Sequence, residues 1–205
     1  MRIGIIGQGF VGTAVRVGLE KYYKINTYDL DSNKRSCNMI TELIKKSDVI
    51  FVCVPTPMNK DGSCNTRTVW DVLDEINYES KKKDKKIIVI KSTVPPGTTE
   101  ILNKEMKNIS VVFNPEFLTE ANFIEDFKNQ DRIIIGGPRP AATIVRRLFY
   151  KVFPNAHIIK TSSTIAEMVK YMTNTFLATK VSFANEIKMI CDKVGVDYDK
   201  VTEYA

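Results

Sequence analysis

The chain has 205 residues, of which 43% are hydrophobic and 26% are charged, with a formal net charge of +6. This length suits one domain with an appended element, because domains usually have about 100 to 150 residues. No apolar run reaches the roughly 18 residues of a membrane span. Glycines interrupt the apolar stretch that follows Arg2, so a secretory signal is not expected, and we predict a soluble cytoplasmic protein.

The cysteines and basic residues exclude several classes of site. Four cysteines lie far apart with no C-x-x-C pair, and the chain has one histidine, so neither a metal site nor a disulfide framework is expected. The basic run at residues 81–86 contains no aromatic residues, and we interpret it as a solvated turn rather than a nucleic-acid site. We therefore predict no nucleic-acid partner, and we also predict no membrane partner. The net positive charge suits an anionic cofactor or substrate.

Short apolar runs that are typical of buried parallel strands recur through the first three quarters of the chain, and amphipathic stretches separate most of them. This alternation predicts right-handed crossovers and an α/β fold, a doubly wound Rossmann-type sheet that is mostly parallel and is followed by a long C-terminal helix. The expected strands are residues 2–6, 24–28, 49–54, 86–90, 110–113, 132–135 and 157–159.

The first expected strand leads directly into the string GQGFVG at residues 7–12, which opens a helical stretch. In this context Gly7 permits a tight turn, Gly9 lets a pyrophosphate approach the backbone, and Gly12 lets the helix close on the strand. Free N–H groups of the first helical turn, which includes Phe10 and Val11, then bind the phosphates. The motif predicts dinucleotide binding.

An acidic residue at the end of the second strand supports this interpretation. Asp29 has about the spacing expected for a carboxylate that binds the ribose hydroxyls, and an acid there favours NAD over NADP. Lys34 and Arg35 weaken this preference slightly, Asp31 is a competing candidate, and Asp29 could also be an ordinary turn residue.

The last quarter predicts one helix of about 30 residues, over 164–193, because it lacks Gly and Pro and its apolar residues have helical spacing. Thr164 and Glu167 have the form of a capping box at its start, and Gly195 ends it. We expect a domain at residues 1–160 and a connecting helix region at 161–205. The helix carries apolar residues that predict a homodimer: Met168, Met172, Phe176, Val181 and Phe183.

Polar side chains follow several of the strands, where an open α/β sheet binds its ligand. They include Thr56, Thr93 and Glu116, and Lys170 lies four residues before Asn174 on one helix face. A lysine and an amide facing a carboxylate-bearing loop can stabilise an alkoxide, which suits alcohol oxidation. Taken singly, each of these groups is more often turn chemistry or exposed helix surface.

Four sequence strings and one helix are more specific than these single groups. The strings are VCVPTP at 52–57, KSTVPPGTT at 91–99, NPEFLTE at 114–120 and DRIIIG at 131–136, and the helix carries Lys170 and Asn174. Together they resemble the UDP-glucose/GDP-mannose dehydrogenase family over residues 1–201. The resemblance implies that NAD is the cofactor and a nucleotide sugar the substrate, with the C6 alcohol of the sugar oxidised twice.

The resemblance also implies roles for particular residues. The adenosine half of NAD is expected to lie against Gly7, Gly9, Phe10, Val11, Gly12, Asp29 and Lys34, and the nicotinamide half against Val54, Pro55, Thr56, Ser92, Thr93 and Glu120. The sugar nucleotide is expected to meet Glu116, Phe117, Leu118, Thr119, Glu120, Lys170 and Asn174. Glu116 matches the residue that assists thioester hydrolysis, Thr93 one that positions a water, and Lys170 and Asn174 those that stabilise the oxyanion.

Two departures from the family pattern limit the expectation. Only residues 32–47 separate the second and third strands, so one wall of the cofactor cleft is expected to be trimmed. The family's nucleophilic cysteine, which forms a thiohemiacetal, has no counterpart in these 205 residues, so we expect incomplete catalysis. Three alternatives stay open: a GDP-mannose dehydrogenase, a 6-phosphogluconate-type dehydrogenase, and a module that binds NAD or a nucleotide sugar without turnover.

Overall fold

The computed structural model describes residues 1–80 and 85–205, so residues 81–84 of the predicted basic turn lie outside the described residues. The chain forms two compact units, Met1–Lys170 and Tyr171–Ala205, which are described separately. This division falls inside a helix, ten residues beyond the expected boundary at residue 160, and the assignment of domains stays a prediction.

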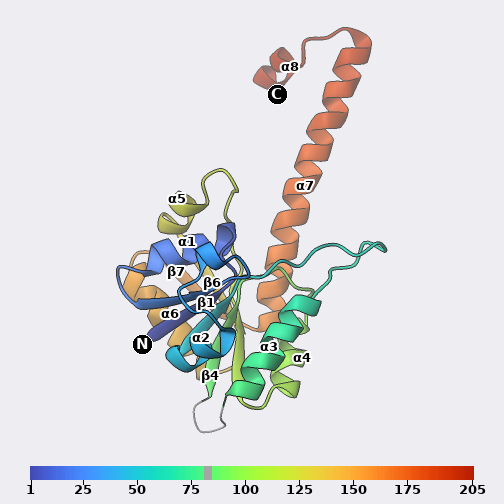
Figure 1. The fold of residues 1–205 in the computed structure, drawn as a ribbon. Coiled ribbons are helices and arrows are strands. Elements are labelled where there is room, and N and C mark those ends of the chain that lie inside the picture. Colours follow the sequence, from blue (N-terminus) through green and yellow to red (C-terminus); the bar gives the residue numbers. More distant parts are fainter. Residues whose placement is uncertain (81–84) are drawn as a thin grey trace. The chain divides into compact units, whose positions relative to one another are not determined.

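Unit one is built on a mostly parallel sheet, as the sequence predicts (Figure 1). Within residues 1–80 and 85–170 the sheet has seven strands in the order β2-β1-β3-β4-β5-β6-β7. The third strand ends two residues earlier than expected, and three later strands are longer by one or two residues. The strands are β1 Arg2–Ile6, β2 Lys24–Tyr28, β3 Val49–Val52, β4 Lys86–Ile90, β5 Ile109–Phe113, β6 Arg132–Gly136 and β7 His157–Thr161.

One pairing in the sheet is antiparallel. β5 meets β6 through the pair Phe113 and Gly136, whereas β6 and β7 are parallel. The connection from β5 to β6 runs over residues 114–131 and contains one short helix, α5, Phe123–Lys128.

Helices cover both faces of the sheet (Figure 1). Successive strand residues point to opposite faces, so Ile50 and Val52 enter one core while Val49 and Phe51 enter the other. α2, α3 and α4 pack on the first face and α1, α5 and α6 on the second. Their bounds are α1 Phe10–Leu19, α2 Ile40–Lys46, α3 Arg67–Glu79, α4 Thr98–Glu105 and α6 Ala141–Val152, with a short 3-10 turn η1 at Ser32–Lys34.

The long helix α7 spans Ser163–Val194, which confirms the prediction of a single helix of about 30 residues. It ends at Gly195, whose φ of +73° lies in the left-handed region that favours glycine. α8, Tyr198–Tyr204, follows, and the Asp197 side chain caps it by accepting from the Asp199 N–H. Within the described residues, no helix is long and apolar enough to cross a membrane.

The predicted capping box at the start of α7 is wrong. The Glu167 carboxylate is completely buried and accepts hydrogen bonds from the N–H of Gly97 (2.6 Å) and from the N–H (2.9 Å) and hydroxyl (2.6 Å) of Thr99. These donors belong to the first turn of α4, whose N–H groups lack partners within their own helix. At the start of α7 the Ser162 hydroxyl accepts from the Ile165 N–H instead, so Glu167 caps a different helix.

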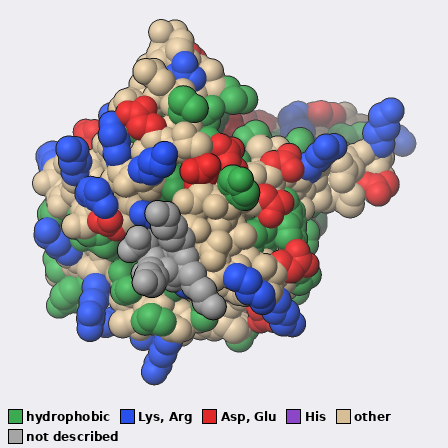
Figure 2. Space-filling model, turned by 60° about the horizontal axis from the view of Figure 1, so that its bottom comes forward, with side chains coloured by type: hydrophobic (Ala, Val, Ile, Leu, Met, Phe, Trp, Pro, Cys, Tyr) green, Lys and Arg blue, Asp and Glu red, His purple; other side chains and the backbone are tan. Residues whose placement is uncertain are grey.

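Charged side chains are mixed on the face of the protein shown in Figure 2, where Lys and Arg lie among Asp, Glu and hydrophobic groups.

Substitution Glu167→Ala is expected to lower the free energy of unfolding by about 1 to 3 kcal/mol, because it leaves buried N–H donors without an acceptor. Urea denaturation measures the effect. Glu105→Ala is the matched control, since Glu105 is exposed on α4 itself and its removal should change stability by less than about 0.5 kcal/mol. Equal unfolding free energies for the two variants would contradict the capping role of Glu167.

Candidate functional site

The turn between β1 and α1 admits glycine alone at two of its three glycine positions. Gly7 has a φ of +89°, and a Cβ there would lie 2.5 Å from the carbonyl oxygen of Cys53. A Cβ on Gly12 would lie 1.8 Å from the carbonyl oxygen of Gly7. Gly9 differs, because a Cβ there would meet nothing within 4 Å. The turn is therefore tightly packed on the protein side and open at Gly9.

The open side of this turn has the chemistry of an anion site. α1 begins immediately after Gly9, and the Thr13 N–H is bonded to the Gly9 carbonyl. The N–H groups of the first helical turn precede this bond and have no partners within the helix. Such donors, together with the helix dipole, bind phosphate groups.

Asp29 joins the end of β2 to the same turn. Its carboxylate accepts hydrogen bonds from the backbone N–H of Gln8 (2.6 Å) and of Asp31 (2.9 Å). Each oxygen keeps a further lone pair for a hydroxyl donor. Asp31 is directed to its own turn, where it accepts from the Asn33 N–H, and it lies 3.8 Å from the Lys34 ammonium group. The geometry thus favours Asp29 over Asp31 as the residue that faces a ligand.

A groove of about 430 Å³ runs from the glycine turn across the ends of β3 and β4, and we call it the turn groove. It brings together most of the residues predicted for a cofactor. Its lining includes Gly7, Gly9, Phe10, Val11 and Asp29 at one end and Val54, Pro55, Thr56, Ser92, Thr93 and Glu116 at the other.

Two hydroxyls in the turn groove also hold the backbone of the site together. Ser92 is buried and donates to the Val54 carbonyl (2.6 Å), which links the ends of β3 and β4. Thr56 donates to the Thr93 carbonyl (2.8 Å). Their oxygens can still accept hydrogen bonds, but their protons are already used.

A buried ion pair includes Glu116, which lines the far end of the turn groove. Lys170 is 4% exposed, and its ammonium group contacts the Glu116 carboxylate at 2.6 Å and the Glu116 carbonyl oxygen at 2.7 Å. The other carboxylate oxygen of Glu116 accepts from the Leu118 N–H (2.8 Å). The guanidinium of Arg132 lies over the Phe117 ring at 4.9 Å, which fixes this loop from a second side.

A second cavity, of about 400 Å³, lies beneath the same loop, and we call it the loop cavity. Phe117, Leu118 and Thr119 line it, as predicted for the substrate loop, and Glu116 lines both this cavity and the turn groove. The Thr119 N–H and hydroxyl both donate to the Asp126 carboxylate of α5. Glu116 is therefore the predicted residue that joins the two cavities.

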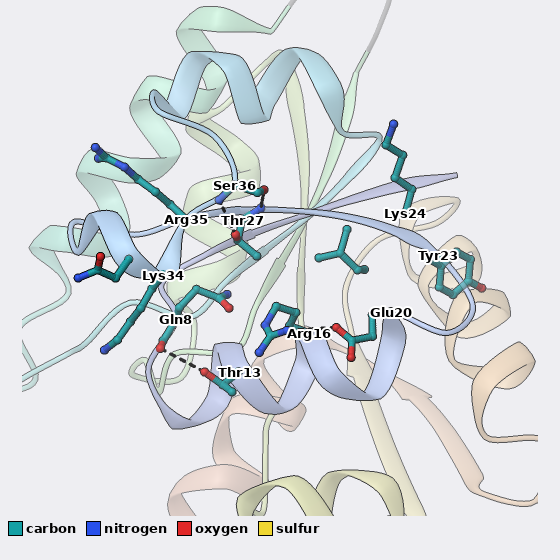
Figure 3. Close-up of a pocket in the computed structure, with 12 residues that line it drawn as sticks. Gln8, Thr13, Arg16, Glu20, Tyr23, Lys24, Thr27, Lys34, Arg35 and Ser36 are labelled. Carbon is teal, nitrogen blue, oxygen red and sulfur yellow. Dashed lines mark hydrogen bonds and ion pairs between the residues drawn. The ribbon is translucent and has the colours of Figure 1, made fainter.

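Three predicted residues lie elsewhere. Lys34 lines a third cavity, of about 750 Å³, between α1 and β2 (Figure 3). In that view it lies beside Gln8, while Lys24 and Tyr23 lie at the opposite end. Glu120 is exposed and lines neither the turn groove nor the loop cavity.

Asn174 is the third of these residues. It is exposed in the second unit, four residues beyond Lys170 along α7. The predicted roles of Lys34, Glu120 and Asn174 stay predictions.

Sequence reasoning missed two groups at the site, Lys91 and Cys53. Both line the turn groove, and burial raises the pKa of the Cys53 thiol to about 12 and lowers that of the Lys91 ammonium to about 8. Lys91 opens the KSTVPPGTT string at the end of β4, and that position was the available signal. Among residues 1–80 and 85–205, no cluster of three His, Cys, Asp or Glu side chains could hold a metal ion.

Comparison with protein families assigns both parts of the chain. Residues 17–154 match the NAD binding domain of the UDP-glucose/GDP-mannose dehydrogenase family, and residues 164–205 match the central domain of that family. The UDP-glucose 6-dehydrogenase YwqF of Bacillus subtilis is 34% identical and aligns with 98% of this chain. An uncharacterized protein of Methanocaldococcus jannaschii is 36% identical and aligns with all of it.

Solved structures share the fold. A UDP-glucose dehydrogenase from Pyrobaculum islandicum superposes with a TM-score of 0.87 at 30% identity over 99% of this chain and 56% of its own. A GDP-mannose dehydrogenase from Pseudomonas aeruginosa gives 0.84 at 27% identity, over all of this chain and 56% of its own. The chain spans 53% of the Bacillus subtilis protein and 27% of the Methanocaldococcus jannaschii protein. In sequence and in fold, this chain belongs to the UDP-glucose/GDP-mannose dehydrogenase family.

Proposed function

We propose that this chain binds NAD in the turn groove and carries the cofactor half of an NAD-dependent nucleotide-sugar dehydrogenase. The supporting observation is that one groove contains the open glycine turn, the Asp29 carboxylate and, at its far end, Thr93 and Glu116. The reaction is oxidation of the C6 alcohol of a nucleotide sugar, of the type that converts UDP-glucose to UDP-glucuronate. A UDP-glucose 6-dehydrogenase among the relatives supports this substrate, and GDP-mannose is the nearest rival.

The residues of the turn groove fit a dinucleotide. The space at Gly9 lets a pyrophosphate reach the N–H groups that open α1. Asp29 has lone pairs for the adenosine ribose hydroxyls, and its negative charge opposes a 2′-phosphate, which favours NAD over NADP. NAD, when bound, supplies the hydride acceptor for the alcohol.

The buried pair of Lys170 and Glu116 would act on the sugar. The Lys170 ammonium group supplies positive charge where an alkoxide develops, and the low-dielectric surroundings strengthen that interaction. Asn174 is proposed to add an amide donor, Thr93 to hold a water, and Glu116 to accept its proton. The loop of Phe117, Leu118, Thr119 and Glu120 is proposed to contact the nucleotide sugar.

Two cysteines of this chain, Cys37 and Cys53, do not have the setting of a nucleophile. A catalytic cysteine needs a lowered pKa, whereas burial raises the pKa of Cys53 to about 12 and also raises that of Cys37. We propose that these residues alone do not complete the four-electron oxidation, which needs a thiolate. A module that binds NAD or a nucleotide sugar without turnover is the second candidate function, and the same cysteines favour it.

A binding titration combined with a turnover assay tests the proposal. We expect NAD to bind, NADP to bind about tenfold or more weakly, and UDP-glucose to give no sustained release of NADH. GDP-mannose and 6-phosphogluconate, assayed in parallel, test the rival substrates. Absence of NAD binding by the folded protein would contradict the function, and sustained turnover of any of these substrates would contradict catalytic incompleteness.

Two glycine variants separate cofactor binding from folding. Gly9→Ala places a methyl group in the space proposed for the pyrophosphate, so NAD should bind about tenfold or more weakly while stability stays within about 0.5 kcal/mol. Gly12→Ala should instead destabilise the fold by more than about 1 kcal/mol, because its Cβ meets the Gly7 carbonyl. Calorimetric titration and urea denaturation measure the two effects, and unchanged NAD affinity in Gly9→Ala would place the phosphates elsewhere.

We also propose a homodimer through α7, since Met172, Phe176 and Phe183 share one side of the helix and are each more than half exposed. Val181 is also exposed but lies on the opposite side of the helix. Contiguous exposed apolar side chains mark interaction surfaces. Sedimentation equilibrium should show a dimer that Phe176→Glu dissociates. Asn185→Glu is the control, because nine residues place it half a turn away from Phe176 on the helix. A monomer at high protein concentration would count against dimerisation. The cytoplasmic location of the protein is a separate prediction.

A further inference from the structure

A buried lysine lies at the site without a part in the proposed chemistry. The Lys91 side chain is 3% exposed, although lysines are almost never fully buried unless their charge is paired. It directly follows β4 and lines both the turn groove and the loop cavity. Because burial of an ammonium group costs free energy, its contacts must compensate.

Those contacts connect the segments that follow β4 and β5 with the middle of β6. The Lys91 ammonium group donates to the Asn114 side-chain oxygen (2.9 Å) and to the Pro115 carbonyl oxygen (3.3 Å). The Asn114 amide in turn donates to the Ile134 carbonyl of β6 (2.6 Å), and its backbone N–H donates to the Ile90 carbonyl of β4 (3.0 Å). Lys91 thus completes a buried network that begins the loop after β5.

The network reaches the ion pair of the site through one peptide bond. The Pro115 carbonyl is bonded to Lys91, and the next carbonyl, that of Glu116, is bonded to Lys170 at 2.7 Å. Two lysines therefore hold successive peptide groups of the loop. If the Pro115 carbonyl moved, the Glu116 side chain would lose its alignment with Lys170 and with the Leu118 N–H.

The charges of the cluster do not balance. Lys91 and Lys170 are two ammonium groups, and Glu116 is the carboxylate that faces them. The Cys53 thiol, whose pKa burial raises to about 12, stays neutral. Burial lowers the pKa of Lys91 to about 8, while the Glu116 carboxylate opposes the shift and the Lys170 ammonium group adds to it. Lys91 is thus charged at neutral pH and loses its charge in mildly alkaline solution.

We propose that Lys91 is a positioning residue, which fixes the Glu116 side chain on the wall between the turn groove and the loop cavity by holding Asn114 and the Pro115 carbonyl. It acts through the loop and not on a reacting atom. The proposal rests on the proposed function only in taking the turn groove as the NAD site.

The variant Lys91→Met tests this role, because methionine has a similar length and no N–H donor. In this variant the Asn114 side-chain oxygen and the Pro115 carbonyl lose their donor, so Glu116 in the lining of the turn groove is no longer held in place. NADH should therefore bind about tenfold or more weakly at neutral pH. Lys86→Met is the matched control. Lys86 begins β4, the strand that Lys91 follows, and donates to the Ser47 carbonyl at 2.8 Å. It should change NADH affinity by less than about twofold.

Amide hydrogen exchange tests the positioning without any cofactor. The Leu118 N–H is bonded to the Glu116 carboxylate, so its exchange should be about tenfold faster in Lys91→Met and unchanged in Lys86→Met. Equal Leu118 exchange in Lys91→Met and the unsubstituted protein would overturn the proposal. If the unsubstituted protein fails to bind NADH, the proposed function falls, while the Leu118 measurement still decides the role of Lys91.

The pH profile supplies a readout that a purely space-filling side chain would not give. As the pH rises from about 7 to about 9.5, Lys91 loses its proton and holds the Pro115 carbonyl more weakly, so NADH affinity should fall. Lys91→Met should show a flat profile over this range. The unsubstituted protein can be measured in this way even if the variant does not fold. If its NADH affinity did not change with pH over this range, the proposal would be overturned.

Discussion

The contact between the Gly12 position and the Gly7 carbonyl is the constraint on which the site depends. At 1.8 Å from an added Cβ, this carbonyl permits no side chain, and the Cys53 carbonyl excludes one from Gly7 in the same way. The close contacts of Gly12 with the Gly7 carbonyl and of Gly7 with the Cys53 carbonyl hold β1, α1 and the end of β3 together at the glycine turn. The direction of α1, and with it the direction of its unpaired N–H groups, follows from this packing. The Asp29 bond to the Gln8 N–H then fixes the acid beside those donors.

The opposite end of the groove is organised by charge rather than by close packing. The Glu116 carboxylate of the loop after β5 lies near two buried lysines, Lys91 after β4 and Lys170 of α7. β6 pairs antiparallel with β5, and its Ile134 carbonyl accepts from the Asn114 amide, which anchors the start of this loop.

The periodicity of the sequence predicted the strands along the chain, the mostly parallel sheet and the long helix, because those depend on local pattern. The glycine turn was predictable for the same reason. The antiparallel pair of β5 and β6 was not, since the direction of a strand depends on the path of its connection and not on the apolar pattern of the strand itself. Glu167 is the clearest case in which a local sequence pattern predicted the wrong contact. Its spacing from Thr164 matches a capping box, but its partners lie about 70 positions away, at the start of α4.

Lys91 was missed for a related reason. A lysine at a strand end is ordinarily solvated, and burial of this one is decided by Asn114 and Pro115, which approach only after β5 is added to the sheet. Glu116 and Lys170, by contrast, were predicted as site residues through family resemblance, and the structure brings them to 2.6 Å. Their separation in the chain gave no indication of that contact.

The short connection between β2 and β3 has a structural consequence of its own. β2 lies at the end of the described sheet, and an edge strand can pair with other chains. Here the connection itself covers part of the edge, because the N–H groups of Ser36 and Cys37 donate to the Thr27 carbonyl and the Ser36 hydroxyl accepts from the Thr27 N–H. Lys24, on the same strand, adds a charge of the kind that discourages edge pairing. The connection and the Lys24 charge together protect this edge of the sheet.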